Sequence, residues 1–240
     1  MTERRTEQVP VPDGSELRLT IASPESVVRG GIVVFHEARG VTTAVQQLAG
    51  ELAGEGWLAV VPHLYHRYGE ESAVESAGEL AEDGDPEQVR RRIGRLTADS
   101  LRLDVDASLR WLSTQGVSAD RIGVMGYGLG GTVALVVATQ RDLGAAVTID
   151  GVGVVEPVAP ALPAMTQAAS ELRCPWLGLY SRGGPVPEDE VLKLQVPVHS
   201  AQVATDLVQL SDGAPRFGTR SGAAVEAWSR TLNWFDSHLR

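Results

Sequence analysis

The sequence has a single cysteine, Cys174, among its 240 residues, and this scarcity excludes an internal disulfide. No Cys/His spacing suited to zinc is present either. Basic residues are outnumbered, because 21 Lys and Arg stand against 31 Asp and Glu, which gives a net charge of −10. That charge opposes nonspecific attraction to nucleic acid or to an anionic membrane. We therefore expect no metal and no cofactor, and small-molecule partners rather than nucleic acid.

Long apolar runs are also absent from the sequence. None approaches the roughly 18 residues that a membrane span needs. The first residues, MTERRTEQVPVPDG, are polar and lack the apolar segment of a signal peptide. We accordingly expect no membrane association and a cytoplasmic location. The chain is long enough to bury one core, and no repeat or interdomain linker interrupts it, so residues 1–240 are predicted to be a single domain.

Short β-branched-rich runs alternate with helical patterns along most of the chain. The expected strands lie within residues 30–37, 56–64, 121–128, 145–151, 174–181 and 205–213. The expected helices lie within residues 42–56, 99–116 and 129–140. This alternation predicts an α/β fold, with a mostly parallel central sheet of about seven or eight strands flanked by helices.

Two further segments complete the predicted architecture. The amino-terminal segment indicates a hairpin that turns at Asp13-Gly14, so an antiparallel edge precedes the parallel strands. Residues 70–96 are highly charged and are predicted to form two helical pieces, broken around Gly84, Asp85 and Pro86, with a solvated face.

The stretch VMGYGLGGTV, residues 124–133, allows two interpretations. Gly126, Gly128 and Gly131 spell G-x-G-x-x-G between a strand and a helix, and Asp150 follows the next strand, as in a dinucleotide-binding fingerprint. That fingerprint usually opens its fold, whereas several strands precede it here. The alternative is a nucleophile elbow, whose strained turn needs small residues such as Gly126 and Gly130 around its centre. The central residue would then be Gly128, where an enzyme carries Ser or Cys.

The elbow interpretation is supported by a resemblance that spans roughly residues 8 to 238. GYGLGG is similar to the G-Y-C-L-G-G elbow of the dienelactone hydrolase family, which are α/β-hydrolases with a Cys-His-Asp triad. VVPHLYHRYG resembles the family segment P-D-L-Y-x-R, with His63 in place of the Asp. Three other segments match in order and spacing: IVVFHEARGV, CPWLGLYSRGGPVP and LSDGAPRFG. This breadth favours an α/β-hydrolase fold over a dinucleotide-binding domain.

The resemblance implies that all three triad positions are replaced. Gly128 stands at the nucleophile position, and Gly183 stands at the acid position, three residues before Val186. The histidine position falls on Pro215, or on Ala214 if the loop shifts by one residue. Glycine offers no atom for attack and proline no exchangeable proton, so the resemblance implies a degenerate triad and a pseudoenzyme.

The resemblance also implies which parts of the site survive. Glu37 corresponds to the glutamate that contacts the nucleophile in the family, and the backbone N–H groups of Ala38 and Leu129 correspond to the oxyanion hole. We expect a pocket at the strand ends that binds a small polar or acidic molecule, because arginine can hold a carboxylate. Its predicted lining is His36, Glu37, His63, Tyr65, His66, Arg67, Tyr127 and Asp150.

Several remaining residues are assigned to the scaffold. Asp150 is either a displaced acid or the cap of a helix or turn. His199 and His238 are expected at the surface, while Ser181 and Cys174 are expected to be structural.

Two functions follow from this reading. The first is a hydrolase-like protein that binds a small molecule or serves regulation without covalent chemistry. The alternative is an active hydrolase or lyase of nonstandard mechanism, with Glu37 or a pocket histidine as general base and an oxyanion hole from Ala38 and Leu129.

Overall fold

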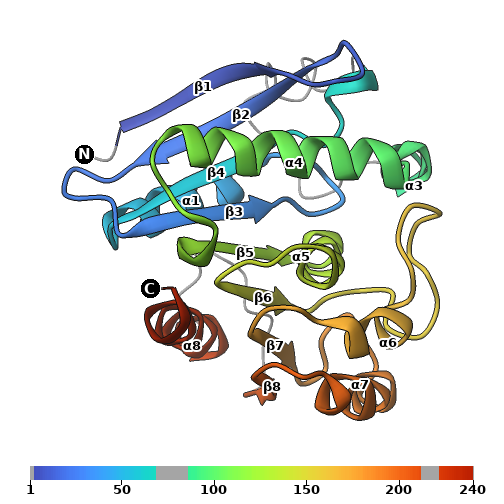
Figure 1. The fold of residues 1–240 in the computed structure, drawn as a ribbon. Helices are drawn as coiled ribbons and strands as arrows, with labels where there is room; N and C mark the ends of the chain where they lie inside the picture. Colours follow the sequence, from blue (N-terminus) through green and yellow to red (C-terminus); the bar gives the residue numbers. More distant parts are fainter. Residues whose placement is uncertain (1–2, 69–85, 212–221, 240) are drawn as a thin grey trace.

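The computed structural model describes residues 3–68, 86–211 and 222–239. Their strands form one eight-stranded sheet in the order β1-β2-β4-β3-β5-β6-β7-β8 (Figure 1). β1 (Glu3–Pro10) and β2 (Glu16–Ser23) pair antiparallel, with their turn at Asp13 and Gly14. β2 also pairs antiparallel with β4 (Trp57–Pro62). The predicted antiparallel edge is confirmed.

The other strands run parallel to β4. They are β3 (Gly30–Phe35), β5 (Ile122–Tyr127), β6 (Ala145–Ile149), β7 (Trp176–Ser181) and β8 (Thr205–Leu210). All residues of β3, β4, β6 and β7 are buried, as expected of parallel strands covered on both faces. The mostly parallel α/β sheet predicted from the sequence is confirmed, and the carboxyl ends of its parallel strands meet at one edge.

Helices cover both faces of this sheet. Side chains of α4 (Ala98–Thr114), α5 (Leu129–Gln140) and α7 (Glu188–Ser200) share one apolar cluster with the strands. Side chains of α1 (Thr43–Gly54) and α8 (Gly222–His238) belong to the cluster on the opposite face. Two shorter helices are α3 (Pro86–Arg95) and α6 (Met165–Ala168). No helix among the described residues is long and apolar enough to cross a membrane.

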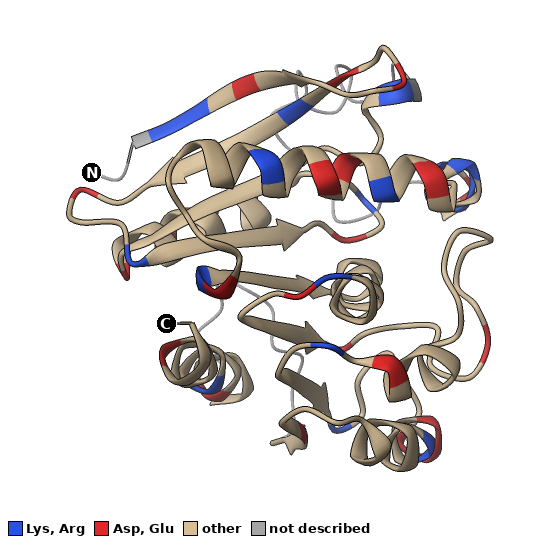
Figure 2. Ribbon diagram, viewed as in Figure 1, with Lys and Arg blue, Asp and Glu red and all other residues tan. Residues whose placement is uncertain are grey.

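The α4 helix shows how the sequence sets its own boundaries. Thr97 caps the helix by accepting a hydrogen bond from Ser100 N at 3.0 Å, and Ser100 Oγ accepts one from Thr97 N at 3.1 Å. Leu101, Val105 and Leu112 are buried along one face, as their spacing predicts. The helix also carries both acidic and basic residues along its length (Figure 2). α3 begins at Pro86, as predicted, whereas the first helical piece expected before it lies outside the described residues.

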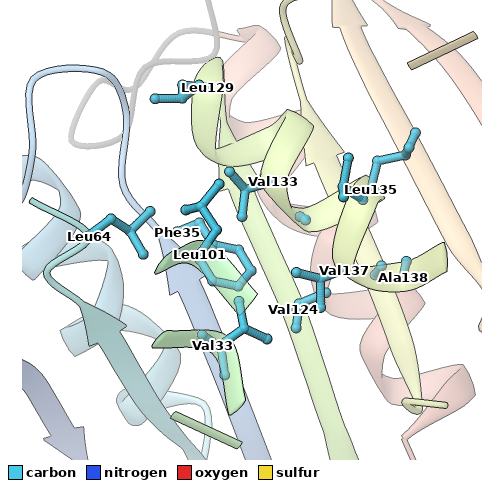
Figure 3. Close-up of a cluster of buried hydrophobic side chains, with 14 of the residues drawn as sticks. Val33, Phe35, Leu64, Leu101, Val124, Leu129, Val133, Leu135, Val137 and Ala138 are labelled. Carbon is cyan, nitrogen blue, oxygen red and sulfur yellow. The ribbon is translucent and has the colours of Figure 1, made fainter. Parts of the chain in front are cut away.

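The α5 helix is apolar around most of its circumference, which is typical of a buried helix. Figure 3 shows Val133 and Val137 of α5 beside Phe35 and Val124 of the sheet. Burying each such side chain stabilises the fold by roughly 1.5–3 kcal/mol. The packing therefore fixes the helix whose first residue, Leu129, follows the glycine turn.

Candidate functional site at the glycine elbow

A sharp turn joins β5 to α5, and Gly128 lies at its centre. The backbone angles of Gly128 are φ 50° and ψ −117°, a conformation that glycine adopts far more readily than other residues. Among the described residues, no atom lies within 4 Å of a Cβ placed on Gly128. The turn therefore has the backbone conformation of the predicted elbow, and no described residue occupies the space where a side chain would project.

Gly126 and Gly130, on either side of Gly128, must be glycine because a side chain would clash. A Cβ on Gly126 would overlap the backbone of Gly130, and a Cβ on Gly130 would overlap the carbonyl oxygen of Phe35. The first turn of α5 thus lies directly against the ends of β5 and β3. This close approach is the steric requirement that a nucleophile elbow imposes on its flanking residues.

Backbone hydrogen bonds tie the elbow to the end of β6. Gly128 N donates to Ile149 O at 3.0 Å, and Gly128 O accepts from Thr132 N at 3.2 Å. Val152 N also donates to Gly128 O, at 3.4 Å. The residue after Ile149 is Asp150, which the turn therefore holds close to the elbow.

Two backbone N–H groups beside the elbow make no hydrogen bond within the described part of the chain. They belong to Ala38, two residues beyond His36, and to Leu129, at the first position of α5. The carbonyl groups of Phe35 and His36 lie against Gly130, so the loop that carries Ala38 adjoins the first turn of α5. These are the two groups predicted to form an oxyanion hole.

The position predicted for the acid, Gly183, follows β7. Gly183 has a φ of 62°, and no described residue has an atom within 4 Å of a Cβ placed there. Gly184 N donates to Ser181 O at 3.2 Å, which closes the turn. Pro215 and Ala214, the two candidates for the third position, lie outside the described residues.

Asp150 stands out among the predicted site residues by its backbone. It is the only non-glycine residue with positive φ, 46°, in the described part of the chain. Its side chain accepts hydrogen bonds from Ser181 N at 2.8 Å and from Ser181 Oγ at 3.0 and 2.8 Å. Burial raises the pKa of the Asp150 carboxyl, and the hydrogen bonds from Ser181 oppose this shift. Asp150 and Ser181 thereby join the ends of β6 and β7.

Tyr127 precedes Gly128 and lies within electrostatic reach of two predicted site residues. Burial raises the pKa of Tyr127 well above its usual value, and the carboxylates of Asp150, Glu37 and Glu51 raise it further. Glu37 itself is exposed at the end of the β3 loop. The negative charges of Asp150 and Glu37 thus act on the Tyr127 hydroxyl.

His36 and Tyr65 support the loop that follows β3. The buried His36 accepts a hydrogen bond from Leu64 N at its Nε2, 3.1 Å away, so its Nδ1–H donates to Glu37 O at 2.7 Å. Tyr65 packs on His36 with ring centroids 5.0 Å apart, and its hydroxyl donates to Ala38 O at 3.0 Å. The two ring nitrogens of His36 are therefore engaged with Leu64 N and Glu37 O, while Tyr65 holds Ala38 O in place.

The other two predicted histidines make contacts away from Gly128. His63 is buried, and its Nε2 lies 2.8 Å from Thr20 Oγ1 of β2. His66 Nε2 lies 3.1 Å from a carboxylate oxygen of Asp104. Each of these imidazoles has a protein partner.

Arg67 belongs to a charged cluster that sequence reasoning did not find. Its Nη1 donates to Asp104 Oδ2 at 2.8 Å, and its Nε donates to Asp13 Oδ2 at 2.8 Å. Burial by itself lowers the pKa of Arg67, but the hydrogen bonds and charges of Asp104 and Asp13 outweigh it, so the pKa is raised. Asp104 could have been noticed, since it lies between Leu101 and Val105 on the apolar face of α4.

The remaining candidates lie in scaffold positions. His199 is exposed on α7, and its Nδ1 lies 2.7 Å from Gln195 O. Cys174 is buried before β7, and burial raises its pKa to about 12. His238 lies near the end of α8, partly buried against Trp234.

Comparison with known structures defines the class of fold. A Klebsiella pneumoniae protein provisionally described as a dienelactone hydrolase matches with a TM-score of 0.83 at 23% identity, over 98% of this chain and 100% of that one. A dienelactone hydrolase-like promiscuous phosphotriesterase from metagenomic libraries matches with a TM-score of 0.67 at 18% identity, over 99% of both chains. The described sheet and helices have the α/β-hydrolase fold.

Sequence comparison then identifies the family. The model of the dienelactone hydrolase family matches residues 17–239, and the chain belongs to that family. A Yersinia pestis protein provisionally named carboxymethylenebutenolidase is 26% identical over 237 residues, covering 94% of this chain and 85% of its own. A carboxymethylenebutenolidase from Pseudomonas putida is 28% identical over 141 residues, covering 59% of this chain and 58% of its own.

Proposed function

We propose that this chain binds a small polar molecule non-covalently at the elbow and has lost the covalent hydrolysis of its family. The observation that carries the proposal is Gly128, which keeps the elbow conformation but supplies no attacking atom. No described residue fills the space beside Gly128 and Gly183 where two triad side chains would stand, and ligand atoms can occupy that space in this proposal. A binding or regulatory role follows.

The histidines near the site support this proposal. A covalent mechanism needs an imidazole that can take a proton from the nucleophile. His36 has both ring nitrogens engaged, His63 contacts Thr20 and His66 contacts Asp104. These contacts hold the three imidazoles against Leu64, Glu37, Thr20 and Asp104 rather than against Gly128, so they are poorly placed to replace the lost base.

The ligand is expected to contact the polar groups that gather at the elbow. Glu37, Tyr127 and Asp150 supply oxygens, and the N–H groups of Ala38 and Leu129 supply donors. A molecule with both hydrogen-bond donors and acceptors matches this set. Arg67 remains part of the proposed lining, although its guanidinium already pairs with Asp13 and Asp104.

Native mass spectrometry of the purified protein tests the proposal. We expect a small molecule to stay bound, to leave on denaturation, and to raise the melting temperature when added back. Gly128→Ala fills part of the open space and should weaken this binding at least tenfold. Gly14→Ala is the matched control, because Gly14 lies in the hairpin turn, also has a positive φ, 87°, and has no described residue within 4 Å of an added Cβ.

Binding that is equally strong in both variants would place the ligand elsewhere. The absence of any bound or stabilising molecule among polar metabolites would count against a binding function.

A second candidate is an enzyme in which Glu37 acts as general base on water. It is favoured by the exposed Glu37 beside two N–H groups that make no hydrogen bond within the described residues. Turnover without a covalent adduct, abolished by Glu37→Gln, would support it over simple binding.

A further inference from the structure

A groove lies between α4, α5 and the loop that leads to α6, on the face of the sheet that these helices cover (Figure 1). The space between its atoms is about 400 Å³, including the mouth that is open to solvent. Most of its lining is apolar, as in ligand pockets generally. The apolar side chains are those of Leu101, Val105, Val133, Val136, Val137 and Leu162.

The charged residues that line this groove in the described part of the chain are both arginines. Arg102 lies on α4, Arg141 follows the last residue of α5, and no acidic residue shares the lining with them. The chain as a whole has the opposite balance, with a net charge of −10. Apolar walls with cations at the rim are complementary to a molecule that has an apolar chain and an anionic head.

The two arginines differ in how far they are engaged. Arg141 donates from Nε and Nη2 to Asp106 Oδ1, at 3.0 and 2.7 Å, and from Nη1 to Gln140 O at 2.9 Å. Arg102 has longer ion-pair contacts, 3.6 Å to Asp99 and 3.9 Å to Asp106, beyond the roughly 2.7–3.2 Å of a hydrogen bond. The side chain of Asp99 is 87% exposed, so water screens its charge. The guanidinium of Arg102 can therefore turn toward a ligand at little cost.

We propose that this groove binds a medium-chain carboxylic acid, with its carboxylate on Arg102 and its alkyl chain along α5. An arginine can hold a carboxylate through two parallel hydrogen bonds, which fixes the head of the ligand. On α5 the lining extends from Val133 to Gln140, about 10 Å at roughly 1.5 Å per residue, a length that an extended chain of about eight carbons spans. Burial of that chain against the valines of both helices supplies the apolar part of the affinity.

The groove is distinct from the elbow. α5 begins at Leu129 beside the elbow and reaches the groove one turn later, at Val133. None of the described lining residues is among the residues proposed to bind a ligand at the elbow. The two sites are therefore tested separately, and failure of this proposal would leave the proposed function unchanged.

Calorimetric titration with sodium octanoate tests the ligand class. We expect saturable binding to one site, at least tenfold tighter than the binding of octanol or octylammonium, because only the carboxylate can accept hydrogen bonds from Arg102 while carrying the opposite charge. Hexanoate has two fewer methylene groups to bury and should bind roughly tenfold more weakly. Octanoate that does not saturate, or that binds no more tightly than octanol, would overturn the proposal.

A charge variant tests the predicted position of the carboxylate. Arg102→Gln should weaken octanoate binding at least tenfold and leave octanol binding unchanged. Arg110→Gln is the matched control, because Arg110 is also exposed on α4 but does not line the groove. Equal affinities of these two variants for octanoate would show that Arg102 does not hold the carboxylate.

A filling variant and methyl NMR test the position of the alkyl chain. Ala161 is partly exposed in the loop before α6, and Ala161→Phe should fill the groove and weaken octanoate and octanol binding together. In the wild type, octanoate should shift the methyl signals of Val105 and Val137. Shifts at Leu129 in their place would put octanoate at the elbow and contradict the proposal. An Ala161→Phe protein that melts normally and binds octanoate like the wild type would contradict it too.

Discussion

Single residues explain how the elbow keeps its shape. Gly126 and Gly130 have no space for a Cβ, so the packing of α5 against β3 and β5 requires them. No described residue has an atom within 4 Å of a Cβ placed on Gly128 or Gly183, so at these two positions glycine is favoured by the positive φ, 50° and 62°, rather than by the packing. The neighbours of Gly128 thus fix the path of the elbow, and its φ decides which residues fit there without strain.

Asp150 provides a prediction at this scale, because burial raises its pKa in the folded protein. The folded state then binds a proton more readily than the unfolded state, whose Asp pKa is about 3.9. Stability therefore falls as pH rises from the unfolded toward the folded pKa. Asp150→Asn removes this loss of stability. Asparagine tolerates a positive φ, and its side-chain oxygen can still accept a hydrogen bond from Ser181.

We expect the difference in unfolding free energy between wild type and Asp150→Asn to move in favour of the variant as pH rises above about 4. Urea unfolding of both proteins between pH 3.5 and 7.5 measures it. A difference that stays flat, or that moves in favour of the wild type with rising pH, would contradict the assignment of Asp150 as a buried carboxyl with a raised pKa.

At the scale of elements, Arg67 joins three separate parts of the chain. It links the segment after β4 to α4 through Asp104 and to the β1–β2 turn through Asp13. The side chain of Asp104 is 1% exposed. Arg67→Met would leave the Asp104 carboxylate with His66 as its remaining partner. Breaking a buried pair from one side costs about 3–5 kcal/mol.

Chemical denaturation should show this loss of unfolding free energy for Arg67→Met. The double variant Arg67→Met/Asp104→Leu should regain much of it, because it no longer buries an unpaired carboxylate. Arg173→Met is the matched control, because Arg173 pairs with Asp142 through two hydrogen bonds at an exposed site, where a pair contributes at most about 1 kcal/mol. Equal losses in Arg67→Met and Arg173→Met would mean that the buried cluster does not join these elements.

The sequence also predicted the helices and strands more successfully than the side-chain contacts. The apolar spacing of Leu101, Val105 and Leu112 predicted α4, and the short buried runs predicted the parallel strands, because both signals are local. Asp104 was missed because its partners, His66 and Arg67, are more than 30 residues away in sequence. Side-chain partners at that separation are set by the folded topology, which a local pattern does not encode.

For the whole molecule, the mostly parallel sheet with its antiparallel edge and the position of the elbow followed from the family resemblance and from the alternation of strand and helix. The contacts of the predicted pocket residues did not follow from the sequence. His36 and Tyr65 support the loop carrying Ala38, while Arg67 pairs with Asp13 and Asp104. Convergence at one edge of a sheet brings residues near each other, but hydrogen bonds decide which of them remain available to a ligand.

Intact-mass spectrometry after exposure to an activated ester tests most directly the proposal that the elbow keeps its geometry without covalent chemistry. We predict an unmodified 25.5 kDa chain and no burst of released alcohol, because Gly128 has no side chain to acylate. A stoichiometric acyl adduct on the peptide that contains residues 124–133, with a matching burst, would contradict the account.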